Sequence, residues 1–179
     1  RYLEYLESAY SVVTIYPIDI SRKRAVLRKE KKIYFMDPFI FHAIRSWLYG
    51  IEPFKSAEIA VKDPLITGTL VEYVVGEHLI RFVTKENNRT LADPTSSTGL
   101  IGYWRGKGKE VDFIINMRGK FIPIELKYQE VISREDIRGF FAISSLIKRK
   151  GILLTKNVNQ ITERPSHIRI PTLFFLLLI

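Results

Sequence analysis

Two runs of β-type sequence, EVDFIIN at residues 110–116 and KFIPIELKY at 120–128, are separated only by Met-Arg-Gly. So short a connection, with Gly119 able to adopt the backbone of a tight turn, predicts one antiparallel hairpin. Successive side chains of a strand point to opposite faces. In the second run Glu125 and Lys127 therefore project together, while the other face of that strand is apolar.

The segments around this hairpin predict the rest of a sheet and the helices that cover it. The expected elements are a helix over 63–82, a surface loop over 84–99, a strand at 101–105, the hairpin, a helix over 133–148 with Ser133 as its N-cap, and strands at 151–155 and 173–179. This order predicts an α/β fold, with a mixed sheet flanked by helices.

The first fifty residues form a distinct pattern. We expect a helix over 1–9, a strand over 10–20, a charged hairpin tip, a returning strand at 32–35 and a helix from Asp37-Pro38 to Gly50. Helix, hairpin and helix predict a small winged-helix-like subdomain over residues 1–50. Residues 51–62 are expected to be a connector, and residues 63–179 the sheet domain.

Acidic side chains from separate elements converge in this scheme. On the first strand of the hairpin, Asp112 is expected to share a face with Ile114. The opposite face is expected to carry Val111, Phe113 and Ile115. A suitable register then places Asp112 beside Glu125, and a divalent cation relieves the repulsion between the two carboxylates. Glu72 lies at the edge of the apolar stripe of the 63–82 helix and can complete the shell. Oxygen ligands without Cys or His favour Mg²⁺ or Mn²⁺.

Lys127 is the remaining candidate catalytic residue. An ammonium beside a bound cation and a phosphate can orient the attacking water and stabilise developing charge. The reaction class is then hydrolysis of a phosphodiester. The alternative is that Glu125 and Lys127 form an ordinary pair on a solvent-facing strand, because isolated E-x-K tripeptides are frequent.

The formal net charge of +9 favours a polyanionic partner. The candidate phosphate contacts are Arg22, Lys23, Arg24, Arg105, Lys148, Arg149 and Lys150, with plain solvation as the alternative. Trp104 is expected to pack against the sheet rather than stack on a base, and His78 to be a hydrogen-bonded core residue. His42 and His167 have no acidic or histidine partner at metal-ligand spacing. The chain has no cysteine, which excludes thiolate metal sites and fits the cytoplasm.

Several of these segments together resemble a known family. The run from Gly68 to Leu79, YWR at 103–105, EVDF at 110–113 and PIELKY at 123–128 are similar to the C-terminal DUF4143 domain of archaeal and bacterial AAA+-type ATPases, and to PD-(D/E)XK nucleases. YLEYLESAYSV and KKIYFMDP resemble the segment preceding that domain. The resemblance implies a restriction-endonuclease-like fold over 63–179, with Asp112, Glu125 and Lys127 as the nuclease motif and Glu72 as the helical acid.

The resemblance also implies a function and a context. The expected activity is Mg²⁺-dependent hydrolysis of DNA by an endonuclease-type module, as the C-terminal part of a larger ATPase. The chain itself has no P-loop motif, so no ATP site is expected in it. The alternative is a catalytically silent module that binds DNA or a protein partner. A homodimer is plausible because cutting both strands needs two sites, and no membrane contact is expected.

Overall fold

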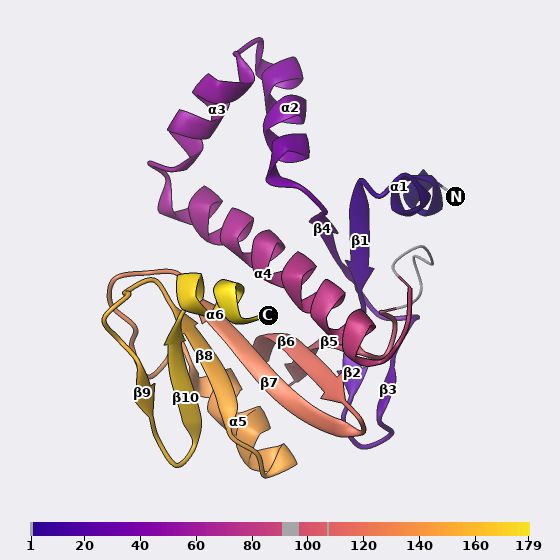
Figure 1. Cartoon of the computed structure of the whole chain (residues 1–179), viewed down its shortest axis with the longest axis vertical. Coiled ribbons are helices and arrows are strands. Elements are labelled where there is room, and N and C mark those ends of the chain that lie inside the picture. The colour runs from indigo at the N-terminus through magenta and orange to yellow at the C-terminus, as the bar shows by residue number, and fades with distance from the viewer. Residues whose placement is uncertain (1, 91–96, 107) are drawn as a thin grey trace.

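A computed structural model describes residues 2–90, 97–106 and 108–179 of the chain. Its centre is a mixed six-stranded sheet (Figure 1). In spatial order the strands are β5 (Ile101–Gly106), β6 (Lys109–Met117), β7 (Lys120–Lys127), β8 (Gly151–Thr155), β10 (His167–Pro171) and β9 (Thr162–Glu163). The pairs β7–β8 and β8–β10 are parallel, and the other pairs are antiparallel. The predicted α/β fold with a mixed sheet is confirmed.

Helices cover both faces of this sheet. On one face, α4 (Pro64–Glu86) and α6 (Thr172–Leu178) pack over a core that includes Leu79, Phe113 and Leu154. On the other face, α5 (Arg138–Ile147) packs over a second core that includes Phe140 and Leu153. Burying both faces in this way leaves little room for unpaired polar groups along the central strands.

Helix α4 begins where predicted and continues further than predicted. The Asp63 carboxylate accepts hydrogen bonds from the backbone N–H groups of Leu65 and Ile66, and Pro64 occupies the first turn. Its buried residues include Val75, Leu79 and Val83, four apart along the helix. This spacing keeps one face of α4 on the sheet up to its last turns.

The N-terminal segment consists of short elements. They are α1 (Tyr2–Ser8), β1 (Val12–Ile15), β2 (Ile18–Asp19), β3 (Arg24–Ala25), β4 (Lys32–Phe35) and α2 (Pro38–Tyr49). β1 pairs with β4, and β2 pairs with β3, so the single strand expected over 10–20 is in fact two strands. They are divided at Pro17, which has no N–H to donate to a ladder. Helix α2 has the predicted Asp37 and Gly50 caps.

The 51–62 segment contains a helix that the sequence analysis did not predict. Helix α3 (Pro53–Ala60) begins after Glu52, whose carboxylate accepts a hydrogen bond from the Lys55 N–H. Glutamate is not among the favoured N-cap residues, which is why the start was missed. In Figure 1, α2 and α3 form a helical pair beyond the N-terminal end of α4.

The N-terminal segment is attached to the sheet at β5. The Tyr103 N–H donates to the Tyr16 carbonyl at 3.2 Å. Beside it, Gly102 has no side chain, and a Cβ there would lie 2.4 Å from the Tyr16 oxygen. Ile15 and Tyr34 are buried in the same core as α4 and β6. The β1–β4 sheet therefore shares its core with the sheet domain.

The C-terminal prediction is wrong. Residues 173–178 lie in helix α6 and not in a strand, and the strand that pairs with β8 on the side away from β7 is β10, which was not predicted. Leu, which supplies four of the seven residues from 173 to 179, is a strong helix former, whereas Phe and Ile are intermediate. Thr172 and Phe175 are buried, whereas Leu173 and Leu177 are exposed, which is a helical alternation. The apolar run had indicated a buried strand because its length alone does not separate the two structures.

Helix α5 also differs from its predicted start. It begins at Arg138, and Ser133 belongs to the preceding turn. There the Ser133 N–H donates to the Asp136 carboxylate at 2.8 Å, and the Asp136 N–H donates to the Ser133 hydroxyl at 3.3 Å. Ser133, the predicted N-cap, therefore closes a turn with Asp136 instead of starting a helix.

Two further predictions concern connections and membranes. The hairpin turn is confirmed, because Arg118 and Gly119 both have positive φ, 53° and 79°. The surface loop expected over 84–99 lies partly in α4, and residues 91–96 are outside the described residues. Among the described residues, no helix has the length and apolar character needed to cross a bilayer.

Candidate active site

The site begins with an irregularity in β6. Gly102 pairs with Ile114 and Trp104 pairs with Val111, so two residues of β6 lie opposite Tyr103 alone. The extra residue is a β-bulge within the Asp112–Phe113 dipeptide, and such bulges redirect neighbouring side chains. The predicted alternation is corrected here: Val111 packs in the α5-side core with Ile114, whereas Phe113 and Ile115 pack in the α4-side core.

The β6–β7 hairpin carries acidic groups where its backbone pairing ends. The last pair is Phe113 with Ile124, and the next opposed positions are Asp112 and Glu125. The Asp112 N–H donates to Glu125 Oε2 at 3.3 Å, and the Leu126 N–H donates to Asp112 Oδ2 at 2.9 Å. Carboxylates thus accept from the backbone of the facing strand, which fixes both side chains.

Glu125 and Lys127 project from the same face of β7, as predicted. Ile122, Ile124 and Leu126 pack on the opposite face, in the α4-side core. The Lys127 ammonium lies 2.6 Å from Glu125 Oε1, and Glu125 is only 3% exposed. The alternative of a solvent-facing Glu125–Lys127 pair does not describe this arrangement.

These groups line a pocket of about 220 Å³ between the hairpin and the start of α5. Its lining includes Glu110, Asp112, Glu125 and Lys127 from the strands, and Asp136 and Arg138 from the α5 side. A small polar pocket with an amine and buried carboxylates is a candidate reaction site.

The pKa values reflect the concentration of negative charge. Burial, together with the Asp112 carboxylate, raises the pKa of Glu125 to about 8. Burial and the Glu72 carboxylate raise the pKa of Asp112. Burial acts to lower the pKa of Lys127, but the Glu125 and Asp112 carboxylates outweigh it and raise that pKa. Lys127 is therefore held in its charged form.

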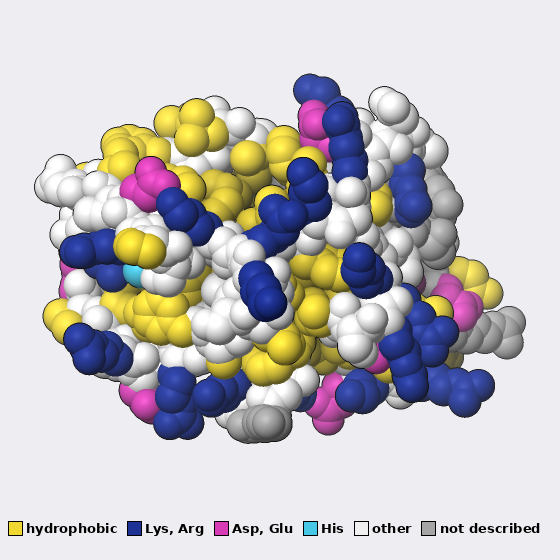
Figure 2. All heavy atoms as spheres, turned by 90° about the horizontal axis from the view of Figure 1, so that it is seen from below, with side chains coloured by type: hydrophobic (Ala, Val, Ile, Leu, Met, Phe, Trp, Pro, Cys, Tyr) yellow, Lys and Arg dark blue, Asp and Glu magenta, His cyan; other side chains and the backbone are white. Residues whose placement is uncertain are grey.

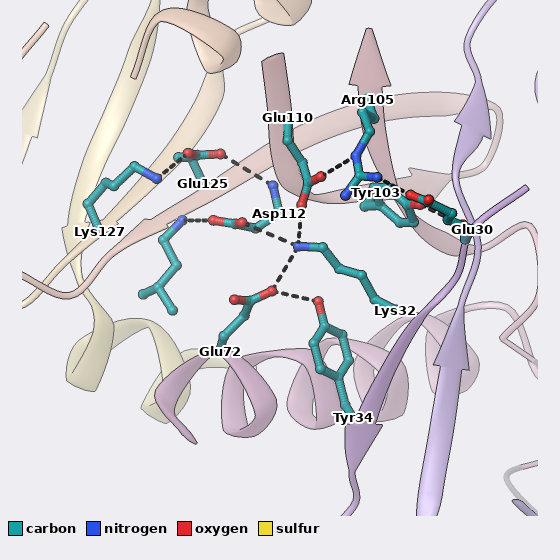
Figure 3. A network of polar contacts seen from close by, with 11 residues as sticks. Glu30, Lys32, Tyr34, Glu72, Tyr103, Arg105, Glu110, Asp112, Glu125 and Lys127 are labelled. Carbon is teal, nitrogen blue, oxygen red and sulfur yellow. Dashed lines mark hydrogen bonds and ion pairs between the residues drawn. The ribbon is translucent and has the colours of Figure 1, made fainter. Parts of the chain in front are cut away.

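Glu72 reaches the site from α4, but another residue stands between it and the hairpin acids (Figure 3). The Lys32 ammonium of β4 lies 2.9 Å from Glu72 Oε1, 2.8 Å from Glu110 Oε1 and 3.5 Å from Asp112 Oδ1. The Tyr34 hydroxyl also donates to Glu72 Oε1, at 2.7 Å. Lys32 thus joins Glu72 to Asp112.

Lys32, Tyr34 and Glu110 are site residues that the sequence analysis missed. In the sequence, Lys32 stands at the start of a predicted strand, beside a run of charged residues that are expected to be solvated. The available signal was the two-residue spacing of Lys32 and Tyr34, which places a lysine and a core tyrosine on one face of β4. Which acid that face meets depends on how β4 packs against α4.

The donor set can be compared with the needs of a divalent cation. Within residues 2–90, 97–106 and 108–179, no three His, Cys, Asp or Glu side chains are grouped so as to hold a metal ion. Of the carboxylates that line the pocket, Asp112 and Glu125 lie at opposed positions of the hairpin, and Mg²⁺ commonly binds through one or two carboxylates while keeping several waters. The carboxylates of Asp112 and Glu125 therefore fit an ion of this kind. Glu72, predicted as a third ligand, is engaged by Lys32 and Tyr34.

The predicted basic residues are divided between two places. Arg22, Arg24 and Arg105 line a larger groove of about 950 Å³ between the β2–β3 hairpin and β5, together with Arg28, Lys29 and Trp104. Lys148 is the C-cap of α5, and Lys150 pairs with Glu163. Lys23, Lys148, Arg149 and Lys150 are exposed. On the face shown in Figure 2, Lys and Arg side chains clearly outnumber Asp and Glu.

Arg105 connects this groove to the acidic pocket. Its guanidinium pairs with Glu30 at the groove and donates to Glu110 Oε2 at 2.6 Å. Glu110 in turn binds Lys32. Trp104 packs against the α5-side core, as predicted.

The histidines stand apart from the site. His78 Nδ1 lies 2.9 Å from the Val74 carbonyl oxygen, so it is hydrogen-bonded as predicted, although its side chain is 38% exposed. His42 and His167 lie within hydrogen-bond distance of serine hydroxyls.

One comparison with known proteins gives a match. A family model described as "Domain of unknown function (DUF4143)" matches residues 67–173, which is more than half of the chain. The matched region contains Glu72, Asp112, Glu125 and Lys127, and excludes Lys32 and Tyr34. No curated protein and no solved structure matches.

Proposed function

The chain belongs to the DUF4143 family, and since that description assigns no activity, we propose from the site itself that it hydrolyses phosphodiester bonds in DNA with the help of Mg²⁺ or Mn²⁺. The observation that carries the proposal is the meeting of Asp112, Glu125 and Lys127 at one small pocket. One buried and one half-buried carboxylate, with a half-buried amine, meet at the open end of a hairpin, and the packing of the fold does not require such groups there.

Each side chain has a role in this proposal. Asp112 and Glu125 hold the divalent cation, which when bound supplies a water of lowered pKa and polarises a phosphate oxygen. Lys127, positively charged beside Glu125, donates a hydrogen bond to the phosphate and stabilises its developing charge. The backbone N–H groups of Leu126 and Asp112 orient the two carboxylates.

DNA is the proposed substrate because of what lies beside the pocket. The groove lined by Arg22, Arg24 and Arg28 is linked to the pocket through Arg105 and Glu110. A duplex backbone carries closely spaced negative charges, so a row of guanidinium groups can hold one part of it while another part reaches the pocket.

The test is a cleavage assay with plasmid and branched DNA in Mg²⁺ or Mn²⁺. We compare the chain with Lys127→Met and with Lys120→Met, which removes an exposed lysine at the other end of the same strand. The expected result is a loss of roughly a hundredfold or more with Lys127→Met alone. Absence of cleavage by the unaltered chain, or equal rates in both variants, contradicts the proposal.

A second candidate function is DNA binding without hydrolysis. It is favoured by the Lys32 ammonium, which already neutralises part of the acidic cluster. Under this alternative the chain binds DNA in a salt-sensitive way and cleaves none. A third alternative is a docking module for a protein partner, and absence of DNA binding at low salt supports it.

The wider context is also part of the proposal. We propose that the domain is of the PD-(D/E)XK type and acts with an ATPase domain in the same protein, as its sequence resemblance implies. Cleavage of both DNA strands then requires two such sites, supplied by a homodimer. Sedimentation of the chain with and without a DNA duplex tests the dimer.

A further inference from the structure

The ammonium group of Lys32 occupies the centre of an acidic cluster formed by Glu72, Glu110 and Asp112 (Figure 3). Its Nζ atom lies within 3.5 Å of a carboxylate oxygen from each of them. The three acids come from α4 and β6, and the lysine comes from β4. The lysine is therefore a contribution of the N-terminal segment to a site otherwise built by the sheet domain.

The surroundings hold this ammonium in place. The Lys32 side chain is 18% exposed, and its Nζ atom lies 5.5 Å from the centre of the Tyr103 ring. β4 is fixed by its pairing with β1, in which Lys32 lies opposite Ile15. Partial burial of a lysine is costly unless it is paired, so the three carboxylates and the ring are its compensation.

Charge balance indicates what the ammonium replaces. Three carboxylates around one point normally require a divalent cation or a raised pKa. Arg105 compensates part of the charge on Glu110 from the groove side. Lys32 supplies a single positive charge that cannot dissociate from the chain. A metal ion brought to the same point would face the repulsion of that charge at close range.

We propose that Lys32 is a built-in counter-ion that takes the place of a second divalent cation among Glu72, Glu110 and Asp112, and so restricts metal binding to the Asp112–Glu125 side. The inference deepens the proposed function, on which it rests for the cation between Asp112 and Glu125. It makes Lys32 a positioning residue of the site. It also commits the chain to a mechanism with a single metal ion.

The test is Mn²⁺ binding by the whole chain, followed by electron paramagnetic resonance and calorimetry. We compare the unaltered chain with Lys32→Met and with Lys31→Met, which removes an exposed neighbouring lysine. The expected result is a single Mn²⁺ in the unaltered chain and in Lys31→Met. Lys32→Met gains a second Mn²⁺, bound at least about tenfold more tightly than any further ion in the unaltered chain. Adding Glu72→Gln to Lys32→Met removes that gain.

The outcomes separate this inference from the proposed function. Equal stoichiometry and affinity in all variants overturn the role of Lys32, while leaving cleavage by the unaltered chain intact. No Mn²⁺ in the unaltered chain with one Mn²⁺ in Lys32→Met supports the role of Lys32 and contradicts the proposed hydrolysis. If Lys32→Met does not fold, as judged by circular dichroism, Lys32→Gln replaces it, because its amide still donates to Glu72 without carrying charge.

Discussion

The two halves of the acidic site are assembled at very different ranges along the chain. Asp112, Glu125 and Lys127 all come from the β6–β7 hairpin, and the bonds between its strands join residues 13 and 14 positions apart. In the other half, Lys32 and Glu72 are 40 positions apart, and they meet only because β4 packs beside α4. The hairpin half therefore forms with local structure, while the Lys32 half depends on docking of the N-terminal segment. We therefore expect substitutions in the hairpin half to remove the proposed cleavage. Substitutions in the Lys32 half are expected to change metal binding or stability.

The largest expected effect is in the hairpin half. Asp112→Asn keeps an oxygen that can accept the Leu126 N–H and removes the charge. We expect cleavage to fall by about a thousandfold with the fold preserved. Plasmid cleavage, with circular dichroism as the check of folding, measures this. Glu86→Gln, which removes an exposed acid at the end of α4, is the control, and an equal loss there removes the distinction between the two halves.

The next effect concerns the attachment of the N-terminal segment. In Gly102→Ala the new Cβ meets the Tyr16 carbonyl oxygen and the Ile18 side chain, at 2.4 and 2.5 Å in the present backbone. We expect the free energy of unfolding to fall by about 3 kcal/mol, because one contact is a backbone atom that cannot rotate away. Urea denaturation measures it.

The control for this substitution is Gly68→Ala in α4, where nothing lies within 4 Å of the added carbon. That change should stabilise the chain by roughly 0.5–1 kcal/mol through helix propensity. If Gly102→Ala costs nothing, the N-terminal segment is not held at β5 in the way described, and the contrast between the two halves disappears.

The third effect is a pH dependence of the hairpin half. The folded-state pKa of Glu125, raised to about 8, lies above its unfolded value, so the folded state binds the proton more tightly. The stability that this proton provides is complete below the unfolded pKa of about 4.3 and is lost as pH rises through about 8. In metal-free buffer we expect the unaltered chain to lose about 2.5 kcal/mol between roughly pH 5.5 and 7.5, relative to Glu125→Gln.

Thermal denaturation at a series of pH values measures this difference. Glutamine resembles the protonated acid and does not titrate, so its profile carries only the contributions that the two proteins share. Parallel profiles for the two proteins would show that Glu125 is charged in the folded state at neutral pH.

The smallest effect is in the Lys32 half. Tyr34→Phe removes the hydroxyl that donates to Glu72, in a residue that is 2% exposed. We expect a cost of about 1.5 kcal/mol, typical of a hydrogen bond to a charged group. Tyr73→Phe is the control, because the Tyr73 ring packs against that of Tyr34. Chemical denaturation measures both costs. Equal costs would mean that the hydrogen bond from Tyr34 to Glu72 adds nothing to the loss of a tyrosine hydroxyl.

The hairpin half of the site was predictable because it follows from two local rules. Alternation along β7 placed Glu125 and Lys127 on one face, and the short Met-Arg-Gly turn placed Asp112 opposite them. The bulge in β6 was not predictable, because it exists only relative to the pairing with β5. The role of Lys32 was not predictable either, since it requires the packing of β4 against α4.

The fold was also predicted only where local sequence signals determine it. Capping residues located the starts of α2 and α4, where Asp-Pro gives one clear signal. They failed at α5, where Ser133 and Asp136 stabilise a turn, and at α3, which has an unusual cap. The C-terminal run was misassigned because Phe and Leu are apolar in either structure, and only the burial of Phe175 against exposure of Leu177 distinguishes them.

The bulge at Asp112 has a consequence for how such a chain can change in evolution. Two residues of β6 opposite Tyr103 direct the Asp112 carboxylate to the pocket. Deleting one residue there would restore regular pairing and move the acids of β6 by one position relative to β7. A descendant with this deletion is expected to keep every acidic residue in its alignment and still lack the proposed hydrolysis, so single-residue gaps in this strand are as informative as substitutions.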